Sequence, residues 1–313
     1  MVPLSTGRAT VLRRAAVRAT LAPSVHNTQP WRLHLRERGL DVWVDRTRQL
    51  AALDPTSRQM IISVGCAVMN ARVSAAGDGL GIEVHRLADE HRPDLLASLV
   101  PSSNPVDSEL AALDDVIELR QTNRGPFAQD EVPPSLIAAI ERAAEAEGAS
   151  LFVVRGADQR AAVARLRQHA EAVENLNPAY RAELRAWTTD DPGRRDGVPG
   201  RTGPQLERPG DESPPVTRST DDQCLVLLCT NGDGPTEWLR AGEALERMLL
   251  EITRRGFSAS PLTAVTEVPS ARAQLREQLG LIGYPHLLLQ IGRAPATPSS
   301  RRRRLVDVLL EDH

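Results

Sequence analysis

Gly65-Cys66-Ala67 and Gly242-Glu243-Ala244 lie 177 residues apart (242 − 65), and this pair of stretches decides how the fold is organised. The same offset relates Gly79-Leu80 to Gly256-Phe257. Each half therefore contains a helical segment of the same length that ends in Gly followed by an apolar residue, a common helix cap. Such a weak internal repeat predicts two related halves in one chain, and the alternative is a chance coincidence of Gly and Ala.

Helices and strands are predicted to alternate irregularly along the chain. Apolar residues recur at helical spacing in residues 11–21, 61–75, 110–119, 136–146, 160–173, 238–252 and 271–279. Short apolar runs predict strands at 31–35, 40–44, 82–87, 151–154, 224–229 and 286–291. Strands 40–44 and 82–87 are expected to bracket the first repeat helix, and 224–229 and 286–291 the second.

The domain organisation follows from the repeat and from one irregular segment. Residues 1–110 are expected to form the first half and residues 111–313 the second. Periodicity fails between Asn175 and Val216, and residues 192–215 are crowded with Pro, Gly and charge. A long irregular segment in a compact protein is usually disordered or a functional flap. Trp187 at its border favours a flap, so we expect an inserted lid at about residues 175–216.

The composition excludes several classes of protein. A formal net charge of −3 and a pI near 6.2 give no electrostatic attraction toward nucleic acid or anionic membrane. Hydrophobic residues make up 41% of the chain, enough for a substantial core. Every basic side chain other than His is Arg, because the sequence contains no Lys. A Schiff-base lysine is therefore impossible, and fixed positive contacts must come from guanidinium groups or helix ends.

Cysteine and histidine spacing gives no metal motif. Cys66, Cys224 and Cys229 sit in apolar stretches, so we expect buried thiols, a reducing compartment and a cytoplasmic location. No run reaches the roughly 18 apolar residues that span a bilayer. The Arg-rich stretch through Leu21 has the composition of a transit peptide, but a first amphipathic helix is the preferred interpretation. No GxGxxG follows a predicted strand, which disfavours a Rossmann domain.

The first motif that carries chemistry is the loop Pro23-Ser24-Val25-His26-Asn27-Thr28-Gln29-Pro30-Trp31. Its prolines fix φ at both ends, while Ser24, Asn27 and Gln29 offer donors and acceptors to a planar heterocycle. A simple helix-capping loop needs only one Ser or Asn, so the density of polar groups favours a site. His26 alone is more typical of a loop histidine with a structural partner than of a catalytic base.

Two arginine motifs complete the set. Arg120-Gln121-Thr122-Asn123-Arg124 offers two guanidinium groups and a hydroxyl to an anion such as phosphate. The alternative is a basic helix end that complements its dipole. Arg301-Arg302-Arg303-Arg304 is typical of a solvated tail or a weak nucleic-acid patch. Next to the first arginine motif, it would supply the remaining positive charge for a phosphate.

Together these motifs resemble the nitroreductase family. In that family an Arg-x-Ser/Thr-x-Lys/Arg stretch binds FMN, a Pro-Ser-x-x-Asn-x-Gln-Pro-Trp loop of the partner subunit reaches the flavin, and a C-terminal arginine segment closes on the phosphate. Here the loop precedes the arginine motif, an order similar to that of the fused, lidded Acg-type flavoproteins. The resemblance implies an α+β, nitroreductase-like fold in which two related halves, each with a mostly antiparallel sheet flanked by helices, form a pseudo-dimer in one chain.

The resemblance also implies roles for individual residues, all of them in cofactor binding. Arg120 and Thr122 would hold the FMN phosphate, assisted by Arg302 or Arg303. Arg124 would lie near the flavin N1/O2 edge. Ser24 and Asn27 would contact the ring, within the loop that also holds Pro23 and Gln29. The segment Ser260-Pro261-Leu262 would lie near flavin N5. One complete flavin site is expected, because the first half lacks its own arginine motif.

Two functions follow from this resemblance. The first is an oxidoreductase in which FMN accepts hydride at N5 from NADH or NADPH and reduces a nitroaromatic or quinone-type acceptor, without a catalytic acid, base or metal. The second is a protein that sequesters FMN under a closed lid with little turnover. A nucleic-acid binder that uses the four arginines is disfavoured by the acidic charge. Fusion of the halves predicts a monomer that mimics a dimer, with no membrane partner.

Overall fold

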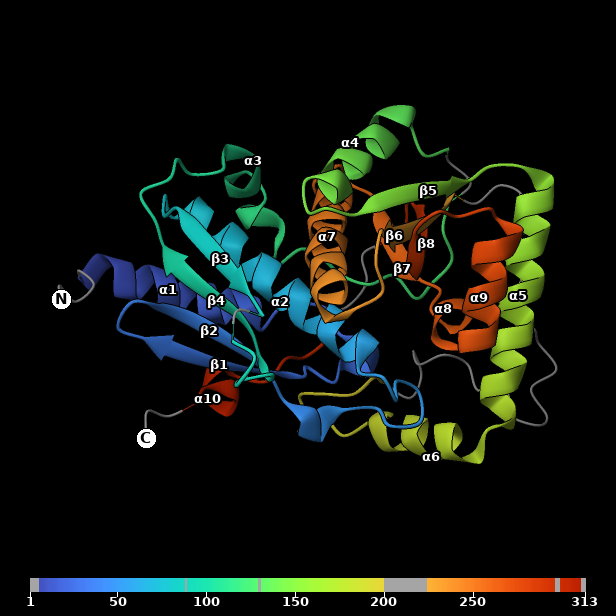
Figure 1. Cartoon of the computed structure of the whole chain (residues 1–313), viewed down its shortest axis with the longest axis horizontal. Coiled ribbons are helices and arrows are strands. Elements are labelled where there is room, and N and C mark those ends of the chain that lie inside the picture. Colours follow the sequence, from blue (N-terminus) through green and yellow to red (C-terminus); the bar gives the residue numbers. More distant parts are fainter. Residues whose placement is uncertain (1–5, 88, 129–130, 200–223, 296–298, 311–313) are drawn as a thin grey trace.

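The computed structural model contains two four-stranded antiparallel sheets that lie on either side of two long central helices (Figure 1). It describes residues 6–87, 89–128, 131–199, 224–295 and 299–310. The predicted α+β class is therefore confirmed. The predicted lid segment is described only up to residue 199, and its remainder lies outside the described residues.

The two sheets have the same strand order. The first has the order β1 (Trp31–Arg36), β2 (Gly39–Val44), β4 (Leu95–Pro101), β3 (Ile82–Arg86). The second has the order β5 (Ser150–Val154), β6 (Cys224–Thr230), β8 (Tyr284–Gly292), β7 (Ser258–Pro261). In each sheet the two central strands pair with one shift in register, which lies at Val42/Trp43 between β2 and β4 and at Leu228/Cys229 between β6 and β8.

Helices cover the sheets and fill the space between them (Figure 1). The larger ones are α1 (Thr6–Ala19), α2 (Arg58–Gly77), α4 (Pro134–Glu145), α5 (Ala157–Leu176), α6 (Pro178–Trp187), α7 (Pro235–Arg254) and α9 (Pro269–Gln278). The short ones are α3 (Ser108–Ala111), α8 (Ala264–Glu267) and α10 (Leu305–Val308). The chain returns to the first half at its C-terminal end, because Leu309 bridges Leu33 of β1.

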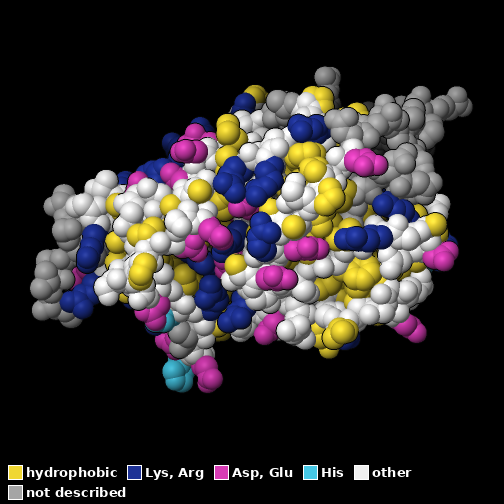
Figure 2. Space-filling model, turned by 90° about the horizontal axis from the view of Figure 1, so that it is seen from above, with side chains coloured by type: hydrophobic (Ala, Val, Ile, Leu, Met, Phe, Trp, Pro, Cys, Tyr) yellow, Lys and Arg dark blue, Asp and Glu magenta, His cyan; other side chains and the backbone are white. Residues whose placement is uncertain are grey.

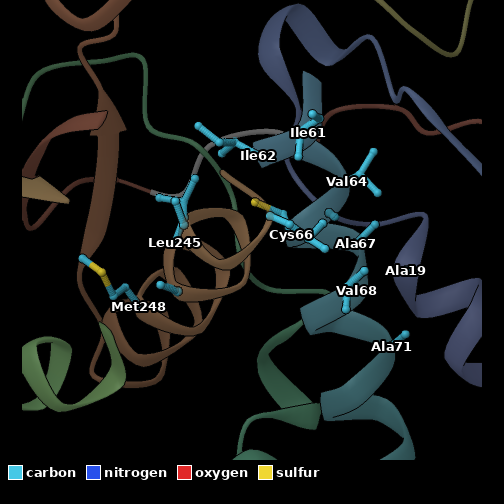
Figure 3. Close-up of a cluster of buried hydrophobic side chains, with 14 of the residues drawn as sticks. Ala19, Ile61, Ile62, Val64, Cys66, Ala67, Val68, Ala71, Leu245 and Met248 are labelled. Atoms are coloured by element: carbon cyan, nitrogen blue, oxygen red, sulfur yellow. The ribbon is translucent and has the colours of Figure 1, made fainter. Parts of the chain in front are cut away.

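Helices α2 and α7 cross at the two glycines of the repeat. A Cβ on Gly65 would lie 2.9 Å from the Cα of Gly242, and one on Gly242 would lie 2.0 Å from the carbonyl oxygen of Ile62. Only Gly permits this approach. Figure 3 shows Cys66 directed from α2 toward α7, while Ala19 of α1 lies on the opposite side of α2. The crossing therefore joins the two halves through one continuous core.

The predicted glycine caps are confirmed in both helices. Gly79 has φ +74° and Gly256 has φ +75°. The residue after each glycine donates its N–H to a carbonyl five residues earlier, in the bonds Leu80 to Ala75 and Phe257 to Ile252. These are Schellman-type ends.

The sequence pattern was wrong at several elements. Residues 110–119 do not form one helix: α3 is followed by a 3-10 turn, Asp114–Val116. The strand that directly follows α7 is β7, which was not predicted. The predicted strand 286–291 is part of β8, and β8 corresponds to β4 of the first sheet, which was also not predicted. Helix α6 also went unpredicted within the irregular segment. It begins with Pro178 behind an Asn177 cap, whose side chain accepts from the N–H groups of Ala179 and Tyr180.

Helix α2 is long and apolar enough to cross a membrane by length and composition. Nearly all of its residues are buried inside the protein. A helix that is apolar on every side is expected at the centre of a two-sided core, and that is its place here.

Candidate functional site

The three sequence motifs meet where the two halves join. Arg302 Nε donates to the carbonyl of Ala22, 3.1 Å away, at the start of the Pro23–Trp31 loop. Arg120 Nη2 donates to the carbonyl of Leu21 at 3.4 Å. Strand β7 joins them, because Asn123 N donates to Ala259 O at 3.0 Å and Thr122 forms a bridge with Ala259. Segments that are 99 to 280 residues apart in sequence thus form one site.

At the centre of the site the guanidinium groups of Arg120 and Arg302 face a single buried carboxylate, and Arg124 lies near Arg302. We call Arg120, Arg124, Arg302 and Glu246 the guanidinium cluster. Arg120 is 3% exposed, and its Nε lies 3.3 Å from Glu246 Oε1. Among the described residues Arg120 Nε and Nη1 and both oxygens of Glu246 have no well-directed hydrogen bond. The cluster is therefore an ion pair plus two further cations, with unused donors in its interior.

The protein environment alters the pKa of several groups in the cluster. Burial, together with the nearby charge of Arg120, lowers the pKa of Arg302 to about 9. Surrounding protein also lowers the pKa of Arg124, although this residue is exposed. Burial raises the pKa of Glu246 to about 7 despite its attraction to the two cations Arg120 and Arg302. Mutual repulsion among the guanidinium groups favours the binding of an anion.

A small cavity opens beside this cluster. It measures about 180 Å³, against roughly 300 Å³ for the smallest sites that enclose a drug-sized ligand. Its lining consists of Leu21, Ile117, Glu118, Arg120, Gln121, Ser299, Ser300 and Arg302. The carboxylate of Glu118 is paired with Arg18. The cavity suits one anionic group rather than a whole dinucleotide or flavin.

The two candidate C-terminal arginines have different surroundings. Arg302 faces Arg120 and Arg124, whereas the charges around Arg303 are Arg48, Arg32, Asp45 and Asp196. The Arg303 side chain donates to the carbonyl of Asp307 at 2.6 Å. Of the two, only Arg302 therefore belongs to the guanidinium cluster.

The Pro23–Trp31 loop is held in an unusual backbone conformation. His26, Asn27 and Gln29 have φ values of 46°, 54° and 50°. Left-handed φ is uncommon outside Gly, and such residues cluster at functional sites. Ser24 Oγ accepts from Gln29 N at 2.9 Å and closes the loop on itself. Burial and the charge of Arg124 lower the pKa of His26 to about 4, so His26 is neutral at pH 7.

Asn27 and Gln29 bind two other segments of the chain. The Asn27 amide donates to the carbonyls of Gly197 at 3.0 Å and Arg301 at 3.1 Å. The Gln29 amide donates to Arg195 O at 2.8 Å, and its oxygen accepts from Arg303 N at 2.7 Å. Each side chain thus joins the segment after α6 to the C-terminal arginine segment. Sequence reasoning missed these partners, because main-chain acceptors leave no side-chain signature.

The segment Thr188–Val198, which we call the strap, lies over the first half. Its two ends form a bridge with each other. Arg48 and Arg194 lie 5.2 and 5.4 Å from the centroid of the Trp187 ring, and both pair with Asp196. Cation–π contacts and ion pairs therefore anchor the strap beside the loop. Glu183 of α6 adds to the anchor by accepting the N–H groups of Ala52 and Leu53.

Ser260, Pro261 and Leu262 lie at the end of β7 and just beyond it. Ser260 pairs with Gln290 and Pro261 with Leu289 of β8. Leu262 N donates to Leu288 O at 2.8 Å. Because the preceding Ala259 binds the arginine motif, the strand fixes this segment relative to the guanidinium cluster.

A second group of charges lies elsewhere at the junction and is balanced, and all of its members except Glu109 are at least partly buried. Glu243 accepts from Arg72 and Arg86, both at 2.6 Å. Arg247 donates to Glu147 and Glu109, both at 2.9 Å. Basic and acidic side chains also lie side by side across the middle of the face in Figure 2. Three arginines and three glutamates satisfy one another here, so this group is structural, in contrast to the guanidinium cluster.

Paired antiparallel sheets and a glycine crossing define an α+β protein, and the cation-rich junction between its two sheets is a candidate anion site. A protein of Mycobacterium tuberculosis named "putative NAD(P)H nitroreductase" is 31% identical over 96% of this chain and 91% of its own length. A second one, "putative NAD(P)H nitroreductase acg", is 28% identical over 97% of both chains. The chain belongs to the nitroreductase family. No family model matches it.

Two solved structures of nitroreductases are similar to this chain at low identity. The FMN-dependent nitroreductase NfnB from Mycobacterium smegmatis, in complex with NADPH, covers 65% of this chain and 100% of its own at 17% identity and a TM-score of 0.43. A nitroreductase with bound FMN from Bacteroides fragilis covers 61% of this chain and 92% of its own at 14% identity and a TM-score of 0.39.

Proposed function

We propose that this chain binds FMN at the guanidinium cluster and acts as an oxidoreductase of the nitroreductase type. The observation that carries the proposal is the unbalanced charge of the cluster, with Arg120, Arg124 and Arg302 against Glu246 alone. The unused Arg120 donors fit a phosphate, which accepts several charge-assisted hydrogen bonds. The residues present therefore fit the phosphate end of FMN.

Each part of the site has a role in this proposal. Arg120, Thr122 and Arg302 would hold the phosphate, and Arg124 would stabilise negative charge at the pyrimidine edge of the ring. Bound FMN supplies the redox chemistry, by accepting hydride from NAD(P)H and passing two electrons to a nitroaromatic or quinone-type acceptor. Pro23, Ser24 and the Ser260–Leu262 segment would confine the ring. All these residues come from one chain, so a monomer can complete the site.

The test is anaerobic mixing of the purified yellow protein with NADH or NADPH while flavin absorbance is followed, then addition of a nitroaromatic or a quinone. Bleaching by a nicotinamide within the time of turnover, and recovery on addition of the acceptor, is the expected result. A protein that contains no flavin and takes none up would contradict the proposal.

A second candidate function, sequestration of FMN, is favoured by the strap. The strap is held by Trp187, by Asp196 and by the amides of Asn27 and Gln29. A strap this firmly anchored would restrict access of nicotinamide and acceptor to the ring. Bound FMN that dithionite reduces but neither nicotinamide reduces would favour this function.

The strap also provides a direct test of the Gln29 contacts. Gln29→Leu removes one bond to Arg195 and one to Arg303 while keeping a similar volume. Each such bond contributes about 1 kcal/mol, so local opening should become roughly 10 to 100 times more frequent. Tryptic cleavage after Arg194 and Arg195, located by mass spectrometry, is expected to accelerate by that factor.

The matched control is Gln274→Leu at an exposed position on α9. It should leave strap cleavage within a factor of two of the parent, as surface changes usually do. Equal cleavage rates in the parent and Gln29→Leu would show that Gln29 does not hold the strap.

A further inference from the structure

Glu246 is a carboxylate inside the site proposed for a phosphate, and this position is unexpected. It lies on α7, is fully buried, and is 3.3 Å from Arg120, the central cation of the cluster. Neither of its oxygens has a well-directed hydrogen bond among the described residues. A buried carboxylate without such bonds is poorly stabilised in its charged form. It is also a like charge for any phosphate that binds the same guanidinium groups.

The groups that face Glu246 come from several parts of the chain. Arg120 follows the 3-10 turn at 114–116, and Arg302 lies in the C-terminal segment. From α2 come the Asn70 amide and the buried Cys66 thiol, whose pKa burial raises well above its usual value. Near neutral pH Glu246 is therefore the group of this set that can change its charge. Its pKa of about 7 leaves it partly protonated there.

We propose that Glu246 couples FMN binding to proton uptake: the phosphate replaces the carboxylate as the anionic partner of Arg120, and Glu246 takes up a proton when the phosphate binds. This inference rests on the proposed FMN site and adds a pH dependence to it. In the balanced reaction, the protein with ionised Glu246 binds the FMN phosphate dianion and takes up one proton. The product is the complex with neutral Glu246. The proton comes from solvent.

The sign of the pH effect follows from linkage. The bound phosphate repels ionised Glu246, so the complex holds more protons than the free protein. Affinity for FMN therefore falls as the pH rises through 7, by up to about tenfold per pH unit for one coupled proton. Phosphate monoesters have already lost their second proton above a pKa near 6, so the ligand contributes little to this slope. His26, with its pKa of about 4, stays neutral throughout.

The experiment is calorimetric titration of the flavin-free full chain with FMN at pH 7, in two phosphate-free buffers of different ionisation enthalpy. Riboflavin, which has the ring without the phosphate, is titrated in parallel. We expect uptake of a substantial fraction of a proton with FMN and none with riboflavin. The FMN affinity should fall about three- to tenfold between pH 7 and pH 8.

Glu246→Gln removes the titrating group with little change in shape. In this variant FMN should bind without proton uptake, and its affinity should change less than twofold between pH 7 and pH 8. Retained riboflavin binding shows that the variant is folded. Glu246 raises the pKa of Arg302, which is about 9 in the parent, so proton uptake is compared at pH 7, where Arg302 is charged in the parent. Glu251→Gln, on α7 but paired with Arg254 and Arg255, is the control and should behave like the parent.

The outcomes separate the two proposals. FMN binding without proton uptake in the parent would overturn the role of Glu246 and leave the flavin site intact. Equal proton uptake in the parent and Glu246→Gln would overturn it too. A chain that binds neither flavin would overturn both the site and the coupling.

Discussion

Arg120→Gln is expected to weaken FMN binding by about 100- to 1,000-fold while riboflavin binding changes by less than threefold. A charged hydrogen bond contributes roughly 1.5–3 kcal/mol, and Arg120 has two buried nitrogens, Nε and Nη1, without a well-directed bond. Losing both contacts to the phosphate would therefore remove about 3–4 kcal/mol of binding free energy. Fluorescence titration of the flavin-free protein with each ligand measures both affinities.

The control for Arg120→Gln is Arg46→Gln, which removes one positive charge at an exposed ion pair with Asp94. Its FMN affinity should stay within a factor of two of the parent, because an exposed pair contributes little. If Arg120→Gln weakened riboflavin as much as FMN, Arg120 would support the ring or the fold instead of the phosphate. The comparison of ligands thus tests the assignment even where the variant is less stable.

The sequence predicted that the three motifs lie together in space, but it did not predict which residues they contact there. The pattern around Arg120 and the Pro23–Trp31 loop marks residue types that bind a phosphorylated heterocycle, and those types are local in sequence. Glu246 carries no such mark, since in the sequence it is one more acidic residue on an amphipathic helix. Its importance arises only because α7 places it 3.3 Å from Arg120. The strap falls within the lid predicted at about 175–216, but its contacts with Asn27 and Gln29 were missed, because these side chains bind backbone carbonyls.

For the fold, long periodic elements were predictable and short ones were not. Helices α2 and α7 have clear apolar patterns and Gly caps, so their positions followed from the sequence. Strand β7 has only four residues, and its stability comes from pairing with β8 rather than from local propensity. Helix α6 follows the end of α5 directly, and its Pro178 hid a helix start within a segment that looked irregular.

Gly242→Ala is expected to lower the free energy of unfolding by about 3 kcal/mol or more, at the upper end of what overpacking in a core costs. The added Cβ would lie 2.0 Å from the Ile62 carbonyl oxygen and 2.8 Å from the Gly65 Cα. Both are backbone atoms, so α2 and α7 must separate and the shared core must loosen. This destabilisation is opposite in sign to the effect of helix propensity, which favours Ala over Gly by up to about 1 kcal/mol.

Gly7→Ala in α1 is the matched control for the effect of helix propensity, because nothing lies within 4 Å of a Cβ at Gly7. It should leave stability unchanged or raise it by up to about 1 kcal/mol. Urea unfolding followed by circular dichroism compares the two variants with the parent. If Gly242→Ala were as stable as Gly7→Ala, the two halves could not be joined by the close helix crossing. In that case the guanidinium cluster, which depends on how α7 meets the C-terminal segment, would need another explanation for its geometry.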